Sequence, residues 1–274
     1  MAERTQLAVW GDPIGHSRSP QLHRAAYNKL GLNWAYDRRQ VGTADFDAAL
    51  RSLDQSWRGL SVTMPLKEAA FHAADERDAH AELTGAVNTL LLGEVRRGFN
   101  TDVGGIVDAF RNARVTQIRR ARILGAGATA ASALVALHEL GATEIDIRAR
   151  RATAAARLQR IADELGVVLT VQPFDATASE VDATVATLPS GTILDDAVST
   201  PLVVAGGTLF EAAYAPWPSA LAAQWPVMNV ISGLEMLLYQ AIRQVRIFHT
   251  GSQDQPLADE AVIVALMRAA VMED

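Results

Sequence analysis

The chain has 274 residues, 49% of them hydrophobic, and a formal net charge of -6. This length allows two domains with sizeable cores, and the acidic balance argues against a nucleic-acid-binding surface or attraction to an anionic membrane. The absence of cysteine excludes disulfides, thiolate metal sites and cysteine nucleophiles. No stretch is long and apolar enough for a signal h-region or a membrane span. We therefore expect a cytoplasmic protein whose partners are small molecules.

Short apolar runs alternate with helix-like stretches in the first part of the chain. The patterns predict strands over residues 7–10, 34–38 and 59–62, and helices over 20–30 and 45–53. Strands that alternate with helices favour a mostly parallel sheet covered on both faces. The predicted fold class is therefore α/β.

The same rhythm restarts near residue 121. A helix is expected first over 100–114, where we place the domain boundary, and the chain then shows strands over 121–125, 144–148, 167–172 and 181–189 and helices over 129–141 and 152–165. After Pro226 the pattern becomes helical over 233–248 and 257–272. The sequence thus predicts two α/β regions followed by a helical tail.

The segment ILGAGATAASAL follows a predicted strand and opens a helix. Gly125, Gly127 and the small Ala130 fit the spacing G-x-G-x-x-G/A. Glycines allow a tight turn and close backbone approach, and the helix N-terminus offers N–H groups to a pyrophosphate. The alternative is a simple tight turn between a strand and a helix, but the strand–turn–helix–strand context favours a dinucleotide site.

The end of the next strand decides which dinucleotide is expected. Asp146 lies at about the distance at which an acid would accept from the ribose 2′-hydroxyl of NAD. Arg148, Arg150 and Arg151 stand at the strand end, where guanidinium groups suit the 2′-phosphate of NADP. NADP is therefore the expected cofactor. The competing interpretation of the arginines is a solvated helix start.

Four stretches of the chain are unusually rich in polar or conformationally restrained residues. They are GDPIGHSRSP (11–20), SVTMPLKEAA (61–70), GAVNTL (85–90) and GFNTDVGG (98–105). Taken singly, Lys67 could be a surface lysine, Asn88 a turn former and Asp102 a helix N-cap. The positions of the serine loop, Thr63–Lys67 and Asn88 favour a shared role. They are expected beyond the carboxyl ends of strands, where the ligands of open α/β sheets bind.

These motifs, together with GAGATA, YAPWPSAL and GLEMLLYQA, occur in an order and spacing similar to those of the shikimate dehydrogenase family, from Gly11 to about Gly251. The resemblance implies a substrate-binding domain over 1–103 and 236–274 and a Rossmann-like NADP-binding domain over 104–235. It also implies reduction of 3-dehydroshikimate to shikimate with NADPH, in aromatic amino-acid biosynthesis, by a monomer or homodimer. No metal is implied, and the six histidines show no close ligand pair.

The resemblance implies roles for individual residues. Ser17 and Ser19 would bind the substrate carboxylate, Thr63, Asn88, Asp102 and Gln240 the ring hydroxyls, and Tyr214 would lie near the substrate. Gly125, Ala126, Gly127, Ala128, Thr129, Arg150, Arg151 and Gly233 would bind the cofactor. His16 would pack to hold the serine loop.

Lys67 would be the acid–base group, with Asp102 beside it. Reduction of a ketone requires a proton at the oxygen that becomes an alkoxide. Desolvation favours the neutral form of a lysine, whereas a neighbouring carboxylate favours the ammonium form. These effects partly cancel, so which of the two residues holds the proton stays open at this point.

Some positions depart from the family pattern. The Asn-Arg-Thr expected at the 2′-phosphate reads Ala149-Arg150-Arg151, which keeps one arginine and puts the exact phosphate contacts in doubt. Arg24, Glu211 and Glu235 replace an asparagine, an aspartate and a glycine that are usual in the family. None of these departures removes a proposed catalytic group.

Three other functions compete with this interpretation. An NAD-dependent quinate/shikimate dehydrogenase is kept open by Asp146, although quinate-using relatives often carry threonine at the position of Ser19. A non-catalytic NADP-binding sensor would not need Lys67 and Asp102. A folate-linked dehydrogenase fits poorly with the serine loop.

Overall fold

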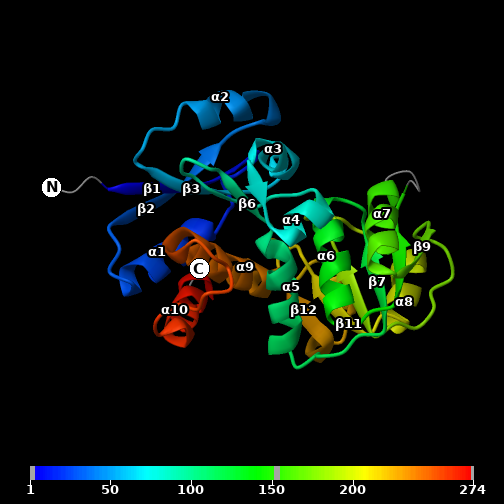
Figure 1. Ribbon diagram of the computed structural model, residues 1–274. Coiled ribbons are helices and arrows are strands. Elements are labelled where there is room, and N and C mark those ends of the chain that lie inside the picture. The colour runs from blue at the N-terminus through cyan, green and yellow to red at the C-terminus, as the bar shows by residue number, and fades with distance from the viewer. Residues whose placement is uncertain (1–3, 151–154, 273–274) are drawn as a thin grey trace. The chain divides into compact units, whose positions relative to one another are not determined.

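The computed structural model describes residues 4–150 and 155–272. The chain forms two compact units (Figure 1), one from Met1–Thr101 with Leu237–Asp274 and the other from Asp102–Met236. Each unit contains one six-stranded sheet with helices, as the predicted α/β class requires. Which ligand each unit binds stays a prediction.

The sheet of the first unit is mixed. Its order is β2-β1-β3-β5-β6-β4, with bounds β1 Thr5–Gly11, β2 Trp34–Gln40, β3 Trp57–Val62, β4 Glu76–Arg77, β5 Thr89–Leu91 and β6 Arg97–Phe99. Strands β1, β2 and β3 are parallel, whereas β5 is antiparallel to both β3 and β6. Residues 92–96 connect β5 to β6, and such a short connection cannot make the crossover that a parallel pair needs.

The central strand β1 is covered on both faces. Its side chains alternate, so Leu7 and Val9 enter one hydrophobic cluster and Ala8 and Trp10 enter another. The helices of this unit are α1 Ser19–Lys29, α2 Phe46–Arg51, α3 Lys67–Ala73, α4 Ala79–Thr84 and α10 Glu260–Met272, with the greater part of α9 Gly233–Thr250 and the short 3-10 turn Thr43–Asp45. Burial on both faces explains why residues 7–10 of this strand are all apolar instead of alternating with polar residues.

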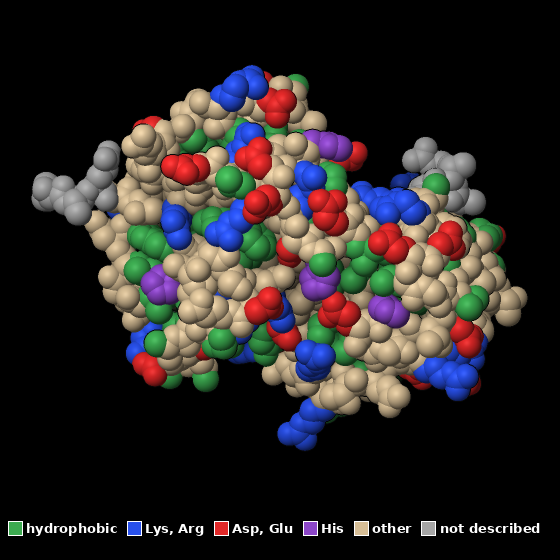
Figure 2. All heavy atoms as spheres, in the orientation of Figure 1, with side chains coloured by type: hydrophobic (Ala, Val, Ile, Leu, Met, Phe, Trp, Pro, Cys, Tyr) green, Lys and Arg blue, Asp and Glu red, His purple; other side chains and the backbone are tan. Residues whose placement is uncertain are grey.

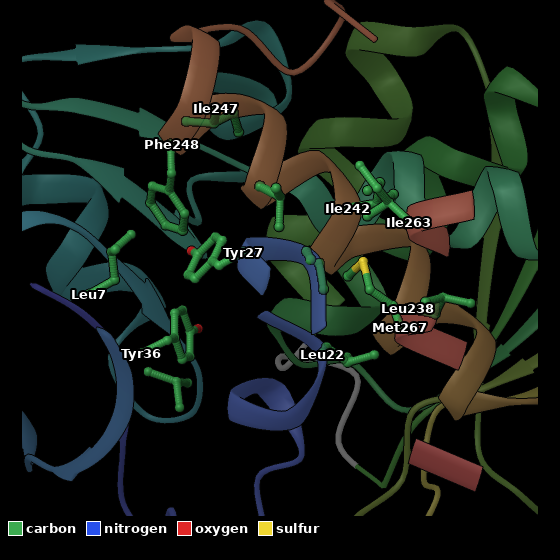
Figure 3. Packing of buried hydrophobic residues seen from close by; sticks show 14 of the residues in the cluster. Leu7, Leu22, Tyr27, Tyr36, Leu238, Ile242, Ile247, Phe248, Ile263 and Met267 are labelled. Atoms are coloured by element: carbon green, nitrogen blue, oxygen red, sulfur yellow. The ribbon is translucent and has the colours of Figure 1, made fainter. Parts of the chain in front are cut away.

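The C-terminal helices complete the core of this N-terminal unit. Figure 3 shows Phe248 of α9 and Met267 of α10 in the same cluster as Leu7, Tyr27 and Tyr36. Phe248 and Met267 are fully buried, and truncation of such a side chain typically costs about 2–5 kcal/mol. The helical tail therefore belongs to the first unit although more than a hundred residues separate them.

The sheet of the second unit is entirely parallel. Its order is β12-β11-β10-β7-β8-β9, with bounds β7 Arg120–Leu124, β8 Glu144–Arg148, β9 Val168–Gln172, β10 Ala183–Ala186, β11 Thr208–Glu211 and β12 Val230–Ser232. Its helices are α5 Thr101–Asn112, α6 Ala128–Glu139, α7 Ala156–Leu165 and α8 Asp196–Val204, with short 3-10 turns at Ala222–Gln224 and Val227–Asn229. Strand order reverses at β7 and β10, and ligands of open α/β sheets bind at such a switch point.

Three features of the second unit differ from the expected elements. Helix α8 was not expected. Strands β11 and β12 were not expected, because runs of four and three residues are too short to show a clear period. Helix α7 begins at Ala156, and residues 152–154 of the expected helix lie outside the described part of the chain.

The charges on the surface are mixed in sign. On the face drawn in Figure 2, acidic and basic side chains are interspersed. Of the helices that the structure describes, none has the length and hydrophobicity needed to cross a membrane.

Candidate functional site

The serine-containing loop follows the carboxyl end of β1. The loop folds back so that Ser17 N donates to Ile14 O over 3.0 Å, and Ser19 N donates to Ser17 Oγ over 3.4 Å. Both serines are buried, at 7% and 5% exposure. Buried hydroxyls suit the orientation of an anion through hydrogen bonds.

Arginines, not His16, hold this loop in place. Arg38 Nε donates to Ser17 O over 2.7 Å, and Arg18 Nη1 donates to Val271 O of α10 over 2.5 Å. His16 is exposed, so the expectation that it packs to hold the loop is wrong. The physical reason is that a guanidinium group reaches backbone carbonyls across a longer span than an imidazole does.

Three motifs of the first unit gather at one edge of its sheet. Thr63 N donates to Trp10 O over 2.9 Å, and Val62 N donates to Asn88 O over 2.8 Å. Lys67 opens α3, and its carbonyl accepts from Val87 N over 3.0 Å. The structure therefore brings the segments of Thr63, Lys67 and Asn88 together.

Asn88 reaches this edge by a different route from the expected one. It precedes β5 and does not follow a parallel strand. Because β5 is antiparallel to β3, the start of β5 and the end of β3 lie at the same edge.

Asn88 and Gln240 are both tied to the protein. Asn88 Nδ2 donates to Thr101 Oγ1 over 2.9 Å, and Asn88 Oδ1 accepts from Thr101 N over 3.0 Å and from Thr89 Oγ1 over 2.8 Å. Gln240 lies on α9 with 7% exposure, and its Nε2 donates to Leu237 O over 2.9 Å. Side chains held in this way present fixed hydrogen-bonding groups to a ligand.

A buried polar group that the sequence patterns did not reveal lies in the same unit. It contains His23, Tyr27, Tyr36, Ser61 and Gln244, linked by hydrogen bonds of 2.7–3.1 Å. Burial lowers the pKa of His23 to about 3 and raises the pKa of Tyr36. The available sequence signal was the presence of polar residues at core positions of helical patterns.

The glycine loop of the second unit has the backbone geometry of a phosphate-binding turn. Gly125 has φ +112°, and a Cβ there would lie 2.6 Å from Thr187 Oγ1. A Cβ at Gly127 would meet no described atom within 4 Å. Ala126, Ala128 and Thr129 are partly exposed, and α6 begins at Ala128 with no side-chain cap. These N–H groups and the open space at Gly127 fit a pyrophosphate.

Asp146 is engaged by two buried arginines. Arg122 Nε donates to Asp146 Oδ2 over 2.9 Å, and Arg148 Nε donates to both Asp146 oxygens over 2.9 and 3.1 Å. The side chains of Arg122 and Arg148 are 0% and 1% exposed. Burial lowers the pKa of Arg122, and the hydrogen bond to Asp146 opposes this shift. The carboxylate thus neutralises buried charge instead of facing a ribose.

The arginines at the end of β8 divide into two kinds. Arg148 donates to the carbonyls of Pro173, Ala176 and Thr177 over 3.2, 2.6 and 2.9 Å, so it anchors the loop after β9. Arg150 is exposed. Arg151 lies outside the described residues. Arg150 is therefore the described arginine available to a phosphate.

The other predicted residues of the second unit occupy varied settings. Asp102 is 4% exposed and lies in the first turn of α5, which starts one residue earlier, so the N-cap alternative does not hold. Tyr214 is half-buried. A Cβ at Gly233 would lie 2.3 Å from Ala212 O, so this position requires glycine for close backbone packing.

Glu211 takes the place of the aspartate usual in the family. Its carboxylate accepts from Ser219 Oγ over 2.7 Å and from Ala213 N over 3.3 Å. Burial raises the pKa of this carboxyl group, and the two hydrogen bonds partly offset the shift. Glu211 thus braces the turn on the N-terminal side of Tyr214.

Comparison with known proteins places these features in one family. The family described as "Shikimate dehydrogenase substrate binding domain" matches residues 9–90. The shikimate dehydrogenase (NADP(+)) of Methanothermobacter thermautotrophicus is 34% identical over 261 residues, which cover 91% of this chain and 92% of that protein. The crystal structure of Mycobacterium tuberculosis shikimate dehydrogenase matches with a TM-score of 0.82 at 39% identity, covering 97% of this chain and 99% of that one.

A larger relative contains a similar region. The pentafunctional AROM polypeptide of Scheffersomyces stipitis is 32% identical over 274 residues, and the match covers 89% of this chain but spans only 17% of the length of that protein. Both the two-unit architecture and the order of the polar motifs agree with the matches over nearly the whole chain. This chain belongs to the shikimate dehydrogenase family.

Proposed function

We propose that the chain catalyses the NADPH-dependent reduction of 3-dehydroshikimate to shikimate. The observation that carries this proposal is the gathering of the Thr63, Lys67 and Asn88 segments at one edge of the first sheet, where the serine loop also leaves β1. Hydroxyl, amide and ammonium groups at one edge suit a small polar ring that carries a carboxylate and several hydroxyls. The 34% identical relative is a shikimate dehydrogenase (NADP(+)), which supports the same activity and cofactor.

In this proposal most of the substrate-binding residues belong to the first unit, whereas Asp102 and Tyr214 belong to the second. Ser17 and Ser19 bind its carboxylate, and Thr63, Asn88 and Gln240 bind its hydroxyls together with Asp102. Tyr214 lies near the substrate. Burial of Ser17, Ser19, Asn88 and Gln240 supports these roles, since hydrogen bonds made away from water discriminate strongly between ligands.

Lys67 and Asp102 form the proposed acid–base pair. When bound, NADPH supplies the hydride to the carbonyl carbon of the substrate. The ammonium of Lys67 gives a proton to the carbonyl oxygen, and the carboxylate of Asp102 orients that ammonium. The half-buried position of Lys67 at the start of α3 supports this role.

The second unit binds the cofactor in this proposal. The loop of Gly125, Ala126, Gly127, Ala128 and Thr129 holds the pyrophosphate. Arg150 and Arg151 hold the 2′-phosphate, and Gly233 lies near the nicotinamide. The engagement of Asp146 by two arginines supports NADP over NAD, because this carboxylate is directed toward buried guanidinium groups and its side chain is only 12% exposed.

The deciding experiment follows the oxidation of NADPH with 3-dehydroshikimate, repeated with NADH, and the reduction of NADP with shikimate or quinate. We expect turnover with 3-dehydroshikimate and a preference for NADPH of at least about tenfold, as one charge-assisted hydrogen bond provides. Absence of turnover would overturn the proposed activity. A preference for NADH and quinate would overturn the assignment of cofactor and substrate. We also propose that the enzyme works in the cytoplasm and that it is a monomer or homodimer. Native mass measurement tests the oligomeric state.

A further inference from the structure

A chain of buried hydrogen bonds runs beneath the proposed substrate-binding residues of the first unit. Its members are Tyr36, Ser61, Gln244, Thr89, Asn88 and Thr101, with a branch through His23 and Tyr27. The chain runs from Tyr36 of β2 to Asn88, which is one of the proposed substrate-binding residues. Its hydroxyl, amide and imidazole groups can each point in two directions, so the direction must be derived.

One backbone group fixes the direction at the Asn88 end. Thr101 N lies 3.0 Å from Asn88 Oδ1. A backbone N–H can only donate, so the atom that faces it must be the amide oxygen. Asn88 Nδ2 consequently points to Thr101 Oγ1, 2.9 Å away.

The fixed oxygen of Asn88 then orders its neighbours. Thr89 Oγ1 lies 2.8 Å from Asn88 Oδ1 and must donate to it. Having used its hydrogen, Thr89 must accept from Gln244, whose Nε2 lies 3.0 Å away. The same Nε2 lies 3.4 Å from the carbonyl oxygen of Asn88, which can only accept. Both Thr89 Oγ1 and Asn88 O therefore require the Gln244 amide nitrogen to face them, which fixes the orientation of this amide.

The orientation of Gln244 determines the branch through His23. Gln244 Oε1 faces His23 Nε2 over 3.1 Å and can only accept. His23 must therefore carry its hydrogen on Nε2, and burial keeps the ring neutral by lowering its pKa to about 3. The unprotonated Nδ1 then accepts from Tyr27 OH over 2.9 Å.

The same reasoning reaches Tyr36. Ser61 Oγ donates to Gln244 Oε1 over 2.7 Å, so it accepts from Tyr36 OH over 2.7 Å. The hydrogen of Tyr36 is therefore directed toward Ser61, and the order of the hydrogen bonds is determined from Thr101 to Tyr36.

We propose that this network has one direction, set by the Thr101 N–H, so that the Asn88 amide oxygen is held toward Thr101 and Thr89 and the orientation of the Asn88 amide is fixed before the substrate binds. The direction itself stands on the geometry alone, and its effect on substrate binding rests on the proposed function. Gln244 and Thr89 are positioning residues in this scheme, because they act through Asn88. In a network of this kind the buried dipoles are already oriented, so substrate binding does not require free energy to reorient them.

The tautomer of His23 reports the direction without any activity measurement. Long-range 1H–15N spectra of the wild-type protein at pH 7 distinguish the two neutral tautomers. We expect the Nε2–H form, and the Nδ1–H form would overturn the proposal. The His23 signals are assigned by their loss in His23→Asn. If that variant fails to fold, single substitutions of the other histidines identify them by elimination.

A pair of variants at Thr89 tests the effect on binding. Thr89→Val removes the donor to Asn88 Oδ1, whereas Thr89→Ser keeps the hydroxyl. One net hydrogen bond corresponds to a change of about 2- to 10-fold, so we expect KM for shikimate to rise by that factor in the valine variant and to return toward the wild-type value in the serine variant. KM for NADP should stay constant in both variants. Equal KM values for shikimate in the two variants would overturn the proposal.

A matched control completes the test. Thr184→Val is the matched control, since Thr184 is also fully buried and donates to Gly206 O over 2.8 Å in the second unit. If wild type showed no turnover, the proposed function would fail while the His23 tautomer would still decide the direction of the network.

Discussion

Replacement of Asp146 by alanine separates two roles for this carboxylate. As a ribose ligand, Asp146 would face solvent, and its loss would change cofactor choice with little effect on stability. In the structure it lies between the buried guanidinium groups of Arg122 and Arg148 and is itself 12% exposed. The change to alanine leaves both positive charges buried without their shared partner.

The expected cost follows from these contacts. Asp146 accepts charge-assisted bonds from both guanidinium groups at 2.9 Å, and removal of one partner from a buried ion pair costs about 3–5 kcal/mol. Arg122 and Arg148 keep their bonds to the carbonyls of Ser179 and Thr177, which offsets part of this penalty. We therefore expect the free energy of unfolding to fall by about 3 kcal/mol, near the lower end of that range.

Urea denaturation followed by far-ultraviolet circular dichroism measures this change. Asp163→Ala is the control, because Asp163 is an exposed aspartate of the same unit and its loss should change the free energy of unfolding by less than about 0.5 kcal/mol. A loss below about 1 kcal/mol in Asp146→Ala would refute the reasoning from buried charge. A gain in preference for NADP in a fully stable variant would return Asp146 to the role of ribose ligand.

Three further changes test the site. Lys67→Ala should lower kcat by about 10²–10⁴-fold with a smaller effect on KM, whereas Lys29→Ala should leave kcat unchanged; near-normal turnover without Lys67 would remove it from the mechanism. Arg150→Ala should raise KM for NADP by about 10- to 100-fold and KM for NAD little, and an equal effect from the exposed Arg160→Ala would indicate a general charge effect. Burial lowers the pKa of His23 in the folded state to about 3 from its ordinary value of 6.5, so the unfolded state binds the extra proton and stability falls as pH drops below 6.5. Its contribution should fall by about 1.6 kcal/mol between pH 6.5 and 5, and urea titrations that show no smaller pH dependence in His23→Asn would contradict this assignment.

The local signals of the sequence predicted much of the fold. The strand before Gly125, the glycine turn and the helix after it lie within one short segment, so their pattern is readable without any partner. The α/β class and the strands β1, β2 and β3 followed from the same kind of local periodicity. Short strands such as β11 and β12 escaped detection, because their sheet position depends on neighbours that lie far away in the chain.

In the candidate site, too, the local motifs were predictable, whereas their arrangement in space was not. The motifs of Ser17, Thr63 and Asn88 were identified as polar stretches around predicted strands, and their chemistry could be proposed from residue type alone. That Asn88 reaches the shared edge through an antiparallel strand could not be predicted, because strand direction depends on the hairpin that β5 makes with β6.

The sequence by itself determined which chemical groups this protein carries and the local turns that present them, because glycine conformation, helix period and residue type are properties of short segments. Only the tertiary structure decided what those groups contact. Asp146 meets Arg122 because the two residues pair across the β7–β8 register, and Gln244 meets His23 across 221 residues of sequence. Such contacts depend on how strands and helices from distant parts of the chain pack together, and for that reason a carboxylate that suits a ribose in the sequence is a partner of buried arginines in the fold.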